Sequence, residues 1–290
     1  MMPEAGMAGG PFKETYRVSQ GSTRSVSHTR SKFDSLWPVY ESILKVGLEE
    51  QDYYLYMDKI FRKADQITEL YTNDDINTFL QSATIYEKDK YYDDASGIIA
   101  SKMLHNLYKS GQCIIGLDLS GIKPIELLGW KLRSRTRKPL TVIVQGELCG
   151  RAFQQSSGTF FIENAGHDTA VDSEGTYYLR QALDGTGEGS FNAKFLIQKQ
   201  SGEFAERSTG RSYGSKFYVK SFEQSRAEIV DRLEYINTTI YSPQGFHKQD
   251  HPHNVDWQFK YISPETFDRK WERAEYVFTH MHDIVKRGYI

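Results

Sequence analysis

Thr141-Val142-Ile143-Val144 is the first of five similar quartets that decide the fold of this 290-residue chain. Each quartet opens with threonine or lysine, continues with three large apolar residues and is followed by a polar stretch that contains glycine. The quartets start at residues 141, 159, 176, 194 and 216, which are 18, 17, 18 and 22 residues apart. The other four are Thr159-Phe160-Phe161-Ile162, Thr176-Tyr177-Tyr178-Leu179, Lys194-Phe195-Leu196-Ile197 and Lys216-Phe217-Tyr218-Val219.

This spacing predicts a parallel β-solenoid of about five rungs. A β-sandwich would bring its strands closer together, because its hairpins join neighbours through roughly two to five residues. A coil that advances one rung per quartet, with glycines at its corners, accounts for the interval more simply. Equivalent positions of successive rungs should then stack, so we expect Phe161 and Tyr178 to lie above one another.

The same rungs resemble the GXGXG domain, a right-handed β-helix found in the large chain of glutamate synthase and in formylmethanofuran dehydrogenase. The resemblance lies mainly in residues 139–189, and it implies a right-handed coil that packs beside catalytic modules without active-site residues of its own. Ala170 departs from the pattern, since a rung often carries glycine there. The glycines that we expect at turns are Gly146, Gly150, Gly158, Gly166 and Gly175.

Helical periodicity flanks the central zone, so the predicted class is α+β, with a right-handed parallel β-helix between N-terminal and C-terminal helical segments. The predicted organisation is a disordered tail at 1–31, a helical domain at 32–111, the β-solenoid at 112–222 and a C-terminal helical cap at 223–290. Apolar residues between Tyr53 and Tyr71 recur at steps of four and three, which predicts one helix. The same pattern predicts helices between Arg226 and Asn237 and, after an N-cap at Ser263, up to Gly288.

Composition excludes several classes of protein. With 36 Lys and Arg against 38 Asp and Glu, the chain lacks the basic excess of a protein that coats nucleic acid. Cys113 and Cys149 are too few for a disulfide framework, which favours a reducing compartment. Neither a signal peptide nor a membrane span is apparent, so the expected location is the cytoplasm.

One candidate metal site lies near the C-terminus. His247, His251 and His253 fall in a single proline-containing loop together with Asp250 and Asp256. Imidazole and carboxylate groups suit zinc and similar ions, although this spacing matches no known signature. The alternative is a solvated polar loop.

A basic stretch offers a candidate anion site. Lys131, Arg133, Arg135 and Arg137 alternate along the chain, so an extended strand would place all four on one side, within reach of successive phosphates. No aromatic residue interleaves with them for base stacking. The alternative is an edge strand whose charges are solvated or neutralised within the fold.

Other polar groups have structural interpretations. The sequence Gly185-Thr186-Gly187-Glu188-Gly189 lacks the Lys-Ser/Thr of a P-loop and is expected to be a wide turn. His167 and Asp168, with Ser156 or Ser157, have no nucleophile elbow, and Cys149 is expected to fill space.

The sequence therefore predicts a non-catalytic scaffold or interaction protein that presents a β-solenoid surface to a protein partner. No catalytic residue and no cofactor is assigned, and neither nucleic acid nor a membrane is an expected partner. One alternative is a metal-dependent enzyme or enzyme subunit that uses the loop at 247–253. The other is an anion or RNA binder that uses residues 131–138.

Overall fold

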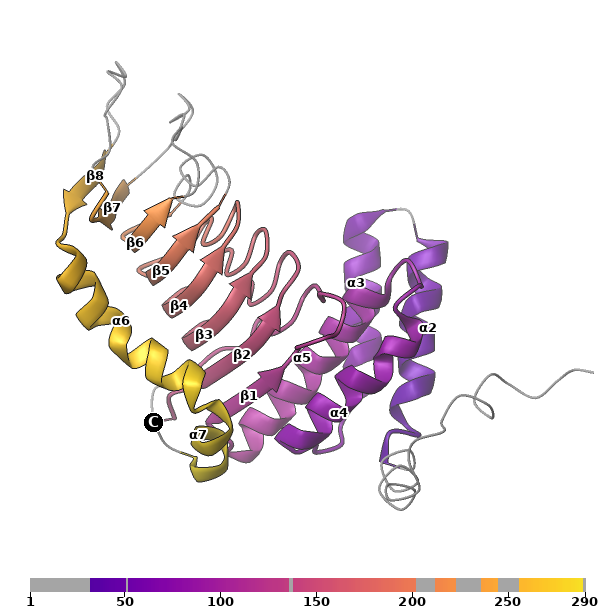
Figure 1. Ribbon diagram of the computed structural model, residues 1–290. Coiled ribbons are helices and arrows are strands. Elements are labelled where there is room, and N and C mark those ends of the chain that lie inside the picture. The colour runs from indigo at the N-terminus through magenta and orange to yellow at the C-terminus, as the bar shows by residue number, and fades with distance from the viewer. Residues whose placement is uncertain are drawn as a thin grey trace, which may run out of the picture.

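A coil of eight parallel strands in one sheet forms the centre of the molecule (Figure 1). The computed structural model describes residues 32–50, 52–135, 138–201, 212–222, 236–244 and 256–288. The strands pair in sequence order, and every neighbouring pair is parallel, which confirms the right-handed β-solenoid. They are β1 (Ile114–Asp118), β2 (Thr141–Glu147), β3 (Ser157–Ala165), β4 (Glu174–Ala182), β5 (Lys194–Gln200), β6 (Lys216–Phe222), β7 (Ile236–Ser242) and β8 (Asp256–Tyr261).

The five quartets stack in register, with their second and fourth residues inside the coil. Phe160 pairs with Tyr177 and Tyr177 with Phe195, and these rings stack at centroid distances of 4.7 and 4.9 Å. Phe217 extends the ladder from Phe195 at 4.6 Å. Since apolar side chains fill both faces of the strands, the quartets show continuous apolar runs instead of strict alternation.

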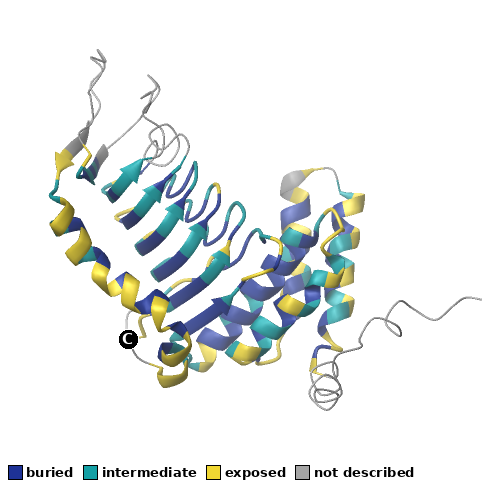
Figure 2. Ribbon diagram, viewed as in Figure 1, coloured by how far each residue is buried: buried dark blue, intermediate teal, exposed yellow. Residues whose placement is uncertain are grey.

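The third residue of each quartet faces outward, where a C-terminal helix covers the sheet (Figures 1 and 2). Phe161 stacks on Tyr178 with their ring centroids 4.6 Å apart, which confirms the predicted alignment. Phe278 meets Phe161 edge-on from helix α6 (Pro264–Thr279). The predicted C-terminal helix is interrupted at His280, and α7 (Met281–Arg287) then packs against β1.

The N-terminal helical domain covers the β1 end of the coil, where α4 contacts the first strand (Figure 1). It comprises α2 (Leu36–Glu49), α3 (Tyr53–Ala64), α4 (Asn73–Ala83), the short 3-10 helix η2 (Thr84–Tyr86) and α5 (Tyr92–Ser110). The helix predicted between Tyr53 and Tyr71 ends at Ala64, although Ile67 and Tyr71 are buried as their spacing suggested. Thr72 and Asp75 form a capping box that starts α4, and Gly111 ends α5 in the left-handed conformation.

The sheet continues beyond the boundary predicted at 222. Strands β7 and β8 belong to the solenoid, so the helical cap contains only α6 and α7 among the described residues after 222. A helix was predicted between Arg226 and Asn237. Its last two residues belong instead to strand β7, and the rest of the segment lies outside the described residues. The tail predicted at 1–31 also lies outside them.

Corners of successive rungs repeat an unusual backbone pattern. Alternate residues have positive φ in three corners 17 residues apart: Arg151, Phe153 and Gln155; Asp168, Ala170 and Asp172; and Gly185, Gly187 and Gly189. Ala170 has a φ of +60°, a conformation that costs a residue with a side chain about 1–2 kcal/mol. Its N–H donates to Ala152 O at 2.8 Å, and the Gly187 N–H donates to Thr169 O at 2.8 Å, so hydrogen bonds join the corners as well as the strands.

Three of the five predicted turn glycines lie within strands. Gly150 and Gly166 are in corners, whereas Gly146, Gly158 and Gly175 belong to β2, β3 and β4. A Cβ on Gly175, where φ is +106°, would lie 2.2 Å from Gly158 O. Glycine is therefore needed there because adjacent rungs approach closely, and not because the chain turns a corner.

Candidate functional site

Two asparagines of α4 cover the outer edge of the first strand. The Asn73 Oδ1 accepts from the Gly116 N–H at 2.8 Å, and the Asn77 Nδ2 donates to Gly116 O at 3.1 Å. Asn77 also accepts from the Asp118 N–H at 2.9 Å. Asn73 and Asn77 are four residues apart, so both side chains project from one face of the helix and replace the neighbouring strand that β1 lacks.

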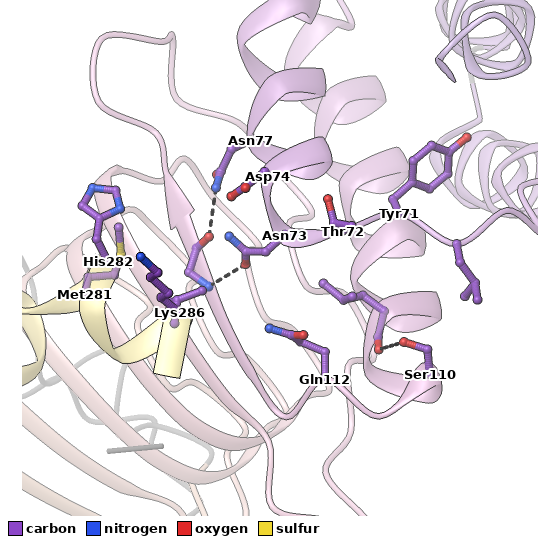
Figure 3. Close-up of a pocket in the computed structure, with 14 residues that line it drawn as sticks. Tyr71, Thr72, Asn73, Asp74, Asn77, Ser110, Gln112, Met281, His282 and Lys286 are labelled. Atoms are coloured by element: carbon purple, nitrogen blue, oxygen red, sulfur yellow. Dashed lines mark hydrogen bonds between the residues drawn. The ribbon is translucent and has the colours of Figure 1, made fainter. Parts of the chain in front are cut away.

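A groove opens beside this edge, between α4 and α5 on one side and α7 on the other (Figure 3). Its volume is about 710 Å³, and its floor includes Gly116. A Cβ on Gly116 would lie 2.5 Å from Val285 Cγ2, so glycine allows α7 to approach β1. The remaining lining residues come from three separate parts of the chain: Leu70, Tyr71, Thr72, Asn73, Asp74, Asn77, Leu107, Ser110, Gln112, Met281, His282, Val285 and Lys286.

The walls of the groove combine apolar and hydrogen-bonding groups. Leu70 at its rim is 65% exposed, although leucine side chains are more often buried. Asp74 extends from α4, and His282 and Lys286 extend from α7 on the opposite side (Figure 3). In the described part of the chain, no ion pair joins Asp74 to Lys286. The groove can therefore accept an apolar side chain together with charged groups of both signs.

A buried acidic group lies where the helical domain meets the first corner of the coil. Asp94 is 8% exposed and accepts a hydrogen bond from the Tyr56 hydroxyl at 2.9 Å. Arg151 bonds to Glu126 and lies 3.7 Å from the Asp94 carboxylate. Burial, reinforced by the charge of Glu126, raises the pKa of Asp94 to about 6. This cluster joins the two domains through the contacts of Arg151 with Glu126 and Asp94, and none of its residues lines the groove beside β1, so we assign it a structural role.

The described part of the basic stretch, residues 131–135, does not form the straight ridge that an extended strand would give. Lys131 has a φ of +56°, and its Nζ lies 5.8 Å from the centroid of the Phe61 ring. The Arg133 Nε donates to Gln155 O at 3.1 Å, while Arg135 makes a single antiparallel bridge. Arg137 lies outside the described residues. The Lys131 side chain therefore points toward α3 and does not align with the arginine side chains that follow it.

The other predicted groups stay apart or cannot be placed. His247, His251 and His253 lie outside the described residues, and within the described ones no group of three His, Cys, Asp or Glu is arranged to hold a metal. Ser156 is buried and contacts the Tyr177 hydroxyl at 2.9 Å, whereas the exposed His167 lies 3.8 Å from Asp184.

Cys149 and the glycine-rich turn have structural roles. Burial raises the pKa of the Cys149 thiol, which disfavours the thiolate needed in a nucleophile. Gly185, Gly187 and Gly189 occupy the left-handed corner positions described above.

The groove was not identified from the sequence. Nothing in the sequence marks Asn73 and Asn77 as partners of β1, because their contact with this strand depends on how α4 docks against the coil.

Comparisons with known proteins identify no relative of this chain. Searches of protein-family models, curated proteins and solved structures found no match to this chain. Among the described helices, none combines the length and apolar character needed to cross a membrane.

Proposed function

We propose that this chain is a non-catalytic scaffold that presents its β-solenoid, and in particular the groove beside β1, to a protein partner. The observation that carries this proposal is the groove itself, with exposed Leu70 at its rim and Met281 and Val285 in its wall. Exposed apolar side chains surrounded by polar groups are typical of surfaces that bind another protein.

A polypeptide segment fits this lining better than a compact apolar ligand. The apolar wall residues suit one or two side chains of a partner, while Gln112 and Ser110 offer hydrogen-bonding groups nearby. Asp74 and Lys286 supply opposite charges on the two sides. Small-molecule pockets are in contrast usually lined mainly by apolar and aromatic groups.

We further propose that the coil is of the GXGXG type and works beside other subunits in the cytoplasm. The alternate glycines at 185, 187 and 189 and the equivalent left-handed positions in two earlier rungs support this assignment. Cys113 and Cys149 are free thiols, which agrees with a reducing compartment.

Photo-crosslinking in the native host tests the proposal. A benzoylphenylalanine residue is introduced at Leu70 or Lys286, and separately at Glu272, an exposed residue of α6 outside the groove lining. We expect a single protein partner to be crosslinked from both groove positions and not from position 272. Absence of any protein adduct from positions 70 and 286, or an identical set of adducts from all three, would contradict the proposal.

A further inference from the structure

Two lysines approach one tyrosine ring where β5 and β6 begin, and a third lysine is the strand neighbour of one of them. The Lys194 Nζ lies 5.6 Å and the Lys270 Nζ 5.2 Å from the centroid of the Tyr218 ring. Lys216 is the register partner of Lys194 on the neighbouring strand. Adjacent strands are about 4.8 Å apart, so Lys194 and Lys216 project side by side.

The outer face of the sheet carries these side chains. Tyr218 packs with the cluster between the sheet and α6, and side chains two residues apart share a face of a strand. Lys194 and Lys216 therefore lie on the outer face, in the row that holds threonine in β2, β3 and β4. The replacement of threonine by lysine in two successive rungs places two positive charges directly opposite each other.

Nothing in the described part of the chain neutralises this group. The nearby ion pair joins Lys220 to Asp268 at 2.6 Å, and none of the three lysines has a carboxylate partner among the described residues. Like charges opposite each other in a sheet destabilise it. Burial, together with the charges of Lys270 and Lys216, lowers the pKa of Lys194. The fold thus bears an electrostatic cost that a bound anion would remove.

We propose that Lys194, Lys216 and Lys270 bind a phosphate-bearing anion with at least two negative charges. An ammonium group is a compact charge with three hydrogen-bond donors, and three of them converging from two strands and a helix match a group with several anionic oxygens. The site lies across β5, β6 and α6, away from the groove lining, and does not depend on the proposed scaffold function.

Two sources would supply this chemistry, a free polyphosphate or the backbone of a nucleic acid. Phe191 and Tyr213 stack with centroids 5.0 Å apart and remain 46% and 42% exposed, each three residues before one of the strand lysines. Exposed aromatic rings near a basic surface can stack with bases but add nothing to the binding of a free polyphosphate.

Titration calorimetry of the full chain with sodium tripolyphosphate at low ionic strength tests the site. We expect binding that weakens at least tenfold in the Lys194→Gln/Lys216→Gln variant. The control is Lys45→Gln/Lys88→Gln, which changes the net charge equally on helical-domain residues and should bind like the unmodified chain. Lys270→Gln, on α6, provides a separate test that leaves the strands unaltered and should also weaken binding.

A second titration with a ten-residue oligothymidylate distinguishes the two sources. If nucleic acid is the ligand, the oligonucleotide binds more tightly than tripolyphosphate and loses affinity in Phe191→Ser/Tyr213→Ser as well as in the lysine variants. If free polyphosphate is the ligand, tripolyphosphate binds more tightly and the aromatic variant behaves like the unmodified chain. The proposal is overturned if neither probe binds, or if the lysine variants bind both probes as well as the control variant does.

Discussion

Replacing Asn77 by alanine tests how the helical domain protects the first strand of the coil. The substitution removes two hydrogen bonds, one to Gly116 O and one from the Asp118 N–H. Each is worth about 1 kcal/mol, and alanine regains about 0.5 kcal/mol through its higher helix propensity. The free energy of unfolding should therefore fall by about 1.5 kcal/mol.

Urea unfolding and amide hydrogen exchange measure this effect together. The Asp118 amide should lose protection by about tenfold or more, because its acceptor is gone, whereas the Gly116 amide keeps Asn73 as its acceptor. Gln81→Ala, on an exposed position of the same helix, is the control and should change neither quantity appreciably. An unchanged Asp118 amide together with an unchanged free energy of unfolding would refute the proposal that α4 serves as the missing strand.

Three further predictions concern the core, the buried acid and the histidine loop. Phe161→Asp should lower the free energy of unfolding, measured with urea, by about 4 kcal/mol or more, because it buries an unpaired charge. The control is Leu48→Asp at a 74% exposed position, which should change this free energy little. Since the pKa of Asp94 is raised to about 6 when folded, stability should fall as the pH rises from about 4 to 6. Asp94→Asn should gain about 1–3 kcal/mol at pH 7 and almost nothing at pH 3, where the carboxyl group is protonated in both the folded and the unfolded chain, and a loss at pH 7 would contradict this. Elemental analysis should find no stoichiometric zinc, iron or manganese, and a bound ion lost on joint replacement of His247, His251 and His253 by alanine would favour the enzyme alternative.

The repeat was predictable because each rung carries the same local signal. Phe161 and Tyr178 are both the third residue of their quartets. Because successive quartets stack in register, the two rings lie above one another in the structure. The signal weakens in β7, where Thr239 and Ile240 fit the quartet pattern but Ser242 takes the place of its last apolar residue. It weakens further in β8, where Lys260 interrupts the apolar run. Both strands join the sheet because the preceding rung offers them an edge, which is a tertiary effect.

Other features required knowledge of the packing. Tyr53, Ile67 and Tyr71 share a helical spacing, but the helix ends at Ala64 and the last two residues are buried from an irregular segment. Lys194 and Lys216 were visible as the only lysines that open the five quartets, yet the role of Lys270 depends on where α6 crosses the sheet. The groove likewise depends on the docking of α4 and α7 around β1.

Disulfide trapping between neighbouring rungs tests the parallel coil most directly. In a chain whose native cysteines are replaced by serine, Thr159 and Thr176 become cysteines, and their positions are register partners on β3 and β4. Parallel strands place such partners about 5 Å apart, within the range of a disulfide, whereas Thr159 and Arg180 would be about 14 Å apart. We expect rapid oxidation of Thr159→Cys/Thr176→Cys and none of Thr159→Cys/Arg180→Cys. The reverse result would show antiparallel pairing of these strands and contradict the parallel solenoid.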